Sequence, residues 1–128
     1  MSSDAAPKDL AGAIDVIEET YEFMLAYAAQ GRVNDRDTSD TSIRAHLERS
    51  SRALEILASA ELPGVAARKF LEVLRQDAVK ASAAIGLVLD RPAISSQMID
   101  NLNASTHLRA LLTDIFLLDE TLGLTVSQ

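Results

Sequence analysis

Residues 9–30 read DLAGAIDVIEETYEFMLAYAAQ, and this stretch decides the fold class. Its apolar residues recur at alternating spacings of four and three, the pattern of an amphipathic helix with one buried face. The predicted inward-facing residues are Leu10, Ile14, Ile17, Tyr21, Met24 and Ala28. Gly31 follows the pattern, and glycine is a typical residue just beyond a helix end. The stretch therefore predicts a helix that packs into a helical bundle.

Two further segments repeat this spacing. The first covers residues 40–61, with Asp40 as its N-cap, and its inward positions are Ile43, Leu47, Ser50, Leu54 and Leu57. The second covers residues 65–89, and its inward positions are Ala67, Leu71, Leu74, Ala78, Ala81, Ile85 and Val88. Pro63 and Gly64 separate the two segments, and Pro92 follows the second, where proline ends a helix. We expect two helices joined by a short turn.

The fourth segment, residues 95–122, gives two conflicting signals. Asn101, Asn103 and Ser105 are poor helix formers, which favours a short helix, a break and a second helix. The apolar spacing nevertheless continues without a slip through Ile94, Met98, Asn101, Ser105, Leu108, Leu112, Ile115, Asp119 and Leu122. We give more weight to the spacing. The prediction is one long helix with a kink near Asn103.

These segments predict an all-α protein, an antiparallel up-down-up-down four-helix bundle. Neither period-two alternation nor a two-residue hairpin turn appears, so no strand is expected. Four helices joined by short turns pack against their sequence neighbours in antiparallel fashion. We expect one domain over residues 9–122, a flexible N-terminus at 1–8 and a C-terminal tail at 123–128.

The composition excludes several classes of function. The net charge is −7, and the arginines are interleaved with acidic residues. Such a surface disfavours nucleic acids and anionic membranes, whose phosphates need a basic patch. Without cysteine, disulfides and thiolate metal sites cannot form. Apolar runs are far shorter than the roughly 20 residues of a membrane span, and the N-terminus does not read as a signal peptide. We expect a cytoplasmic protein.

The polar residues form no known catalytic or metal-binding motif. A di-iron bundle needs Glu-x-x-His, but Ile43 and Ala104 stand three residues before His46 and His107. Glycine-rich phosphate loops, EF-hand loops and nucleophile elbows are also missing. We therefore expect no catalytic residue, no metal and no cofactor, and we take the protein not to be an enzyme.

A short run around His46 resembles a known family. Residues 46–51 read HLERSS and resemble the phospho-accepting helix of histidine phosphotransfer domains, which are acidic four-helix bundles. The resemblance implies that His46 is the phosphoacceptor and that Arg49 offsets the phosphoryl charge. Ser50 replaces the family's usual glycine, and the resemblance covers only these six residues. It supplies one alternative hypothesis for the function.

The first helix is apolar over most of its circumference. Besides the inward positions, Val16, Phe23 and Tyr27 form an adjoining apolar face. Such a helix is either the most buried one of its bundle or faces a partner. The three residues are therefore candidates for an interface with a second copy or with another protein.

Small and polar residues gather near the expected middle of the bundle. Tyr21, Ser50, Asn101 and Ser105 fall where large aliphatic side chains would be expected. They could line a pocket for a small molecule, or Tyr21 and Phe70 could fill the space while the hydroxyls bond to their own helices. The first hypothesis for the function is a non-enzymatic, homo-oligomeric interaction protein, a regulatory or accessory subunit. A small-molecule-binding bundle is a further alternative.

Overall fold

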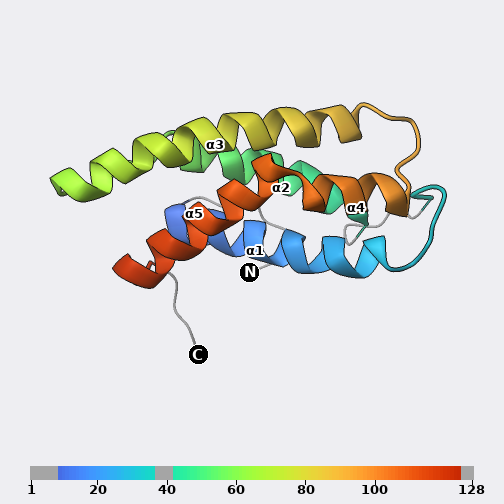
Figure 1. Ribbon diagram of the computed structural model, residues 1–128, viewed down its shortest axis with the longest axis horizontal. Coiled ribbons are helices and arrows are strands. Elements are labelled where there is room, and N and C mark those ends of the chain that lie inside the picture. Colours follow the sequence, from blue (N-terminus) through green and yellow to red (C-terminus); the bar gives the residue numbers. More distant parts are fainter. Residues whose placement is uncertain (1–8, 37–41, 125–128) are drawn as a thin grey trace.

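The computed structural model describes residues 9–36 and 42–124, and within these ranges the protein is all-helical (Figure 1). The helices are α1 (Leu10–Ala28), α2 (Ile43–Ala58), α3 (Val65–Leu89), α4 (Ser96–Ala104) and α5 (Thr106–Leu122). The all-α prediction is confirmed. The predicted flexible N-terminus and residues 125–128 of the predicted tail lie outside the described residues, as does Asp40.

Side-chain caps define where the first two helices begin. Asp9 Oδ1 accepts a hydrogen bond of 2.7 Å from the Gly12 amide at the start of α1. Ser42 Oγ accepts one of 3.1 Å from the Ala45 amide, which makes Ser42 the N-cap of α2 in place of the predicted Asp40. An oxygen at this position satisfies an amide that has no partner within the helix. The helix α2 is therefore shorter at its start than predicted.

Ser105 divides the fourth segment into two helices, so the prediction of one long helix is wrong. Its backbone is extended, with φ −63° and ψ 144°. Its hydroxyl accepts from the Leu108 amide at 3.2 Å and donates to the Leu102 carbonyl at 2.8 Å. Serine competes in this way with the helical backbone for hydrogen bonds. The hydroxyl ends α4 and starts α5 at the same residue.

The break changes which face of α4 is buried. The unbroken spacing predicts Met98 and Asn101 as inward residues, but the structure buries Ile99 and Leu102, which are each one residue further on. Asn101 is exposed and Met98 is half-buried. Beyond Ser105 the predicted positions Leu108, Leu112 and Ile115 are buried, whereas the predicted Asp119 is half-buried and Leu122 is exposed. The helices α4 and α5 are therefore rotated differently about their own axes, so that one unbroken spacing does not describe both.

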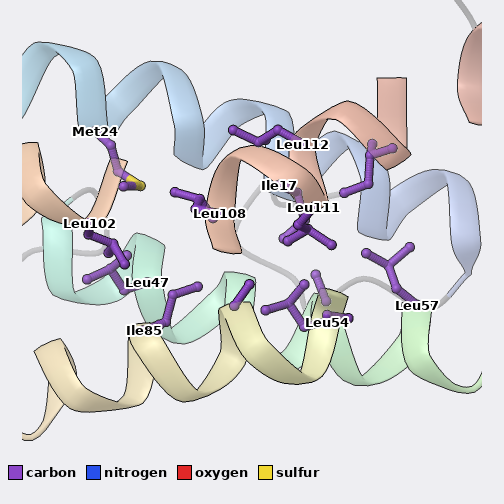
Figure 2. Close-up of a cluster of buried hydrophobic side chains, with 14 of the residues drawn as sticks. Ile17, Met24, Leu47, Leu54, Leu57, Ile85, Leu102, Leu108, Leu111 and Leu112 are labelled. Atoms are coloured by element: carbon purple, nitrogen blue, oxygen red, sulfur yellow. The ribbon is translucent and has the colours of Figure 1, made fainter. Parts of the chain in front are cut away.

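The two halves also cover different neighbours. The helix α2 packs against α1 and α3, while α4 packs mainly on α1 and α5 mainly on α3. In Figure 1, α5 diverges from α4 after the break. The core receives side chains from all five helices, and Figure 2 labels Ile17, Met24, Leu47, Leu54, Leu57, Ile85, Leu102, Leu108, Leu111 and Leu112. All five predicted inward residues of α2 are buried.

A polar network, which we call the clamp, joins four segments through Tyr27, Asp35, Arg44 and Ser96. The buried Tyr27 hydroxyl donates to the Ile94 carbonyl at 2.7 Å, and the Ser96 hydroxyl donates to the Tyr27 carbonyl at 2.6 Å. Both bonds cross from the end of α1 to the segment that begins α4. They account for the burial of a tyrosine and a serine, since buried polar groups need partners.

Arg44 and Asp35 form the second half of the clamp. Arg44 Nε donates to Asp35 Oδ2 at 2.8 Å, and its two other nitrogens donate to the carbonyls of Leu89 and Arg91, each at 2.9 Å. Asp35 Oδ1 accepts from the Ile94 amide at 2.7 Å. One guanidinium thus binds the loop after α1 to the end of α3. A planar group with several donors suits this task.

Among the described residues, no helix combines the length and the apolarity needed to cross a bilayer.

Candidate functional site

An apolar groove lies between α3 and α4, and we call it the α3–α4 groove. Its volume is about 560 Å³, and it is open to the surface. Its lining residues are Ala84, Leu87, Val88, Arg91, Met98, Asn101, Leu102 and Ser105. Five of these eight side chains are apolar. Concave apolar surface of this size is typical of a binding site.

The groove exists because the fourth segment is broken. The helix α4 lies on α1 and has little contact with α3, whereas α5 packs along α3 only beyond Ser105. The C-terminal half of α3 is therefore left without a full neighbour on one side. Leu102 is buried and lines the groove from α4, and Met98 is half-buried beside it.

Leu87 projects from α3 at the edge of this groove. Its exposed fraction is 69%, the highest of any exposed leucine in the described residues. The surface combines a protruding leucine with an adjacent apolar hollow.

The polar edge of the groove carries charges of both signs. Arg91 lines it and donates to Asp90 Oδ2 at 3.0 Å, and both side chains are exposed. An apolar centre with a charged, wet rim is the usual anatomy of a protein interface.

The four predicted pocket residues fall into two separate places. Tyr21 and Ser50 line an internal cavity of only about 10 Å³, together with Ile17, Thr20, Met24, Ile85, Leu108 and Leu112. That is barely the room that one water needs, and the Ser50 hydroxyl already donates to the Leu47 carbonyl at 2.9 Å. Asn101 and Ser105 instead line the α3–α4 groove. The structure thus brings only the second pair to a space of ligand size.

The structure places the predicted phosphoacceptor His46 inside the protein. His46 is 7% exposed, and its ring stacks on Phe23 with 3.9 Å between ring centroids and 17° between planes. Its Nδ1 lies 2.8 Å from the Ser42 carbonyl, which can only accept, so Nδ1 carries a proton. Arg49 is equally buried. A phosphoacceptor must be reached by its partner, and this burial does not favour that role.

The three predicted interface residues lie on α1 with little free surface. Tyr27 is 1% exposed and belongs to the clamp, while Val16 and Phe23 are half-buried. Contacts of α1 with α2 on one side and with α4 on another account for its wide apolar surface. The interface prediction for these residues stays untested, and the apolar α3–α4 groove lies elsewhere.

Within the described residues, no three histidine or carboxylate side chains come together in a way that could hold a metal ion. Comparison with protein-family models, with curated proteins and with solved structures found no match to this chain. Inferences about function therefore start from the groove and its chemistry.

Proposed function

We propose that this chain is a non-enzymatic interaction protein that associates with a second copy of itself through the α3–α4 groove. The observation that carries the proposal is the combination of an apolar hollow of about 560 Å³ with the 69% exposed Leu87 at its edge. Both belong to one surface patch. Their burial against a partner would remove apolar area from water, the main favourable term in association.

A second copy is the occupant that this patch favours. In a two-fold dimer, each chain uses the same patch, so the patch must carry both a projection and the hollow that receives it. Leu87 supplies the projection, and Val88, Met98 and Leu102 supply the hollow. The edge of the groove supports the same choice, because the exposed Arg91–Asp90 ion pair offers charges of both signs that a two-fold axis could pair between chains.

The helical arrangement fits this proposal. We interpret the five helices as an antiparallel four-helix bundle in which α4 and α5 share the fourth position. That interpretation rests on the neighbours of each helix, since α1, α2 and α3 pack in sequence and the α4–α5 pair lies against α1 and α3. A closed fourth position would leave no groove. The interface thus depends on the irregular part of the bundle.

Leu87→Glu is the variant that tests the proposal. Sedimentation equilibrium of the full chain should give twice the chain mass of 13.8 kDa for the wild type. The glutamate would have to be desolvated in an apolar hollow, so we expect Leu87→Glu to weaken the dimer by at least about tenfold in Kd. Leu25→Glu is the matched control, because Leu25 is 46% exposed on α1 and does not line the groove. This control should dimerise like the wild type.

Two results would overturn the proposal. One is a wild type that stays monomeric at all concentrations, and the other is equal weakening by Leu25→Glu and Leu87→Glu. A native mass spectrum that shows a monomer with a bound apolar molecule would also contradict it, and would favour the small-molecule alternative for the same groove. Phosphate transfer at His46 and a cytoplasmic location stay predictions from the sequence.

A further inference from the structure

Two aspartates meet across the contact between α3 and α5. Asp114 lies on α5 and is only 9% exposed, among the core residues Leu111, Leu112 and Ile115. Its side chain forms a hydrogen bond with that of Asp77, which is half-buried on α3. The two helices pack closely along this contact. A carboxyl is thus placed in a helix interface where an aliphatic side chain is normally found.

Within the described residues, the charged group that shifts the pKa of Asp114 is Asp77 of α3, and no cation lowers this pKa. Asp114 Oδ2 is buried and has no hydrogen-bond partner among these residues. The ion pairs of Arg44, Arg75 and Arg91 go to other carboxylates, on Asp35, Glu72 and Asp90.

The other acidic groups near α5 act elsewhere on the helix. On α1, Asp15, Glu18 and Glu22 lie close to one another, and from α5 it is Asp119 that repels Glu18. On α4, Asp100 is exposed. The backbones of α2 and α5 do not approach each other closely within the described residues, although Ser50 lines the internal cavity together with Leu108 and Leu112. The Asp77–Asp114 pair is therefore separate from the acidic groups that act on Glu18.

Two hydrogen-bonded carboxyl groups repel each other when both are ionised, so the pair holds one proton to a higher pH than an isolated aspartate does. The pKa of Asp114 is raised to about 7. Burial is the largest cause, the hydrogen bond with Asp77 is the second, and repulsion from Asp77 is the third. The proton is therefore bound in slightly acidic solution and lost in slightly basic solution.

We propose that the Asp77–Asp114 pair is a pH-sensitive latch, which holds α5 on α3 when it carries a proton and loosens the α3–α5 contact when it does not. The bound proton bridges the two helices. Its loss leaves two negative charges facing each other in a contact that also buries Leu111 and Leu118. Neither aspartate lines the α3–α4 groove, so the latch is independent of the proposed self-association.

The sign of the pH dependence follows from linkage. The folded protein binds this proton more tightly than the unfolded chain, in which an aspartate has its ordinary pKa of 3.8. Stability from the pair is therefore complete below pH 3.8 and is lost as the pH rises through about 7. Between pH 5 and pH 8, the latch lowers the melting temperature as the pH increases.

Asp114→Asn tests the latch because an asparagine amide resembles the protonated carboxyl and cannot ionise. We expect the variant and the wild type to melt at similar temperatures at pH 5. At pH 8 the variant should melt about 5 °C higher or more, since it avoids the buried charge. Asp100→Asn on the exposed face of α4 is the control, and its melting difference from the wild type should not change with pH.

Hydrogen exchange locates the effect within the molecule. At pH 8, the amides of α5 should exchange about tenfold faster in the wild type than in Asp114→Asn, whereas those of α2 should exchange alike. Asp77→Asn, at the more exposed position, should give the same sign if Asp114→Asn folds poorly. A melting difference that stays constant from pH 5 to pH 8 in both variants, or equal α5 exchange at pH 8, would overturn the latch.

Discussion

Asp35 and Asp114 both carry carboxyl groups that are largely shielded from solvent, but their surroundings are opposite. The side chain of Asp35 is 8% exposed, and Asp114 as a whole residue is 9% exposed. Burial would raise the pKa of Asp35, but hydrogen bonds from Arg44 and the Ile94 amide and the charge of Arg44 outweigh it, so its pKa is lowered. Asp114 faces Asp77 and has a pKa raised to about 7. The partner, not the depth of burial, decides the direction of the shift.

This difference separates the pH ranges in which the two regions are stable. Asp35 contributes stability that is present above its ordinary pKa of 3.8 and is lost as the pH falls through its lowered pKa. Asp114 contributes stability that is complete below 3.8 and is lost as the pH rises through about 7. Acid therefore weakens the clamp, and mild base weakens the α3–α5 contact.

The largest expected effect follows from removing the cation of the clamp. Arg44→Met leaves the Asp35 carboxylate buried without its ion pair, and the carbonyls of Leu89 and Arg91 lose their donors. We expect a loss of about 3 kcal/mol in the free energy of unfolding at pH 7, measured by urea denaturation. The loss should shrink in acid, as the pH falls through the lowered pKa of Asp35.

Arg44→Met combined with Asp35→Asn is the control for this prediction. The double variant removes the buried charge together with its partner, so it should recover part of the stability that the single variant loses. A single variant that loses less than about 1 kcal/mol would mean that water already solvates Asp35 in the clamp.

A smaller effect is expected for the neutral part of the clamp. Tyr27→Phe removes the hydroxyl that donates to the Ile94 carbonyl at 2.7 Å and lies 3.2 Å from the Asn34 carbonyl. The phenylalanine keeps the packing but leaves a buried carbonyl without a partner, so we expect a loss of about 1.5 kcal/mol by thermal or urea denaturation. This loss should be the same at pH 5 and pH 8. A loss that depends on pH would show that the hydroxyl acts through Asp35.

The smallest effect comes from giving Asp114 the kind of partner that Asp35 has. Asp77→Lys places a cation across the α3–α5 contact, at a half-buried position from which a lysine can reach water. We expect a gain of about 1 kcal/mol at pH 8 relative to the wild type. Melting between pH 5 and pH 8 should no longer fall with rising pH. If the gain is absent and the fall persists, Asp77 does not cause the raised pKa of Asp114.

The sequence was sufficient to predict the regular helices. The bounds of α3 agree with the predicted residues 65–89, because Gly64 and the turn before Pro92 mark both ends. The break at Ser105 is not predicted, because the apolar spacing continues through it. The spacing of apolar residues stays the same across a single residue with extended backbone, so it does not reveal a residue such as Ser105 whose side chain caps the next helix.

The sequence predicts only part of the site. The pattern marks Asn101 and Ser105 as unusual, but it puts them at the middle of the bundle, whereas in the structure they line the α3–α4 groove. Leu87 carried no signal, because an exposed leucine is common on any helix. Asp114 was missed because its significance depends on Asp77, which lies far away in sequence on another helix. Contacts between helices are the information that a single sequence does not supply.

The extended backbone at Ser105 makes α4 and α5 rotationally independent. An unbroken helix turns about 100° per residue. If the helix were continuous, the spacing of the buried Leu108 and Leu112 would extend back to Asn101, and this polar residue would point inward instead of Leu102. The extended backbone at the serine accommodates this difference in rotation within a single residue. The helix α4 can then bury its apolar face against α1, and α5 can bury its apolar face against α3. The groove is the space that remains between α3 and α4.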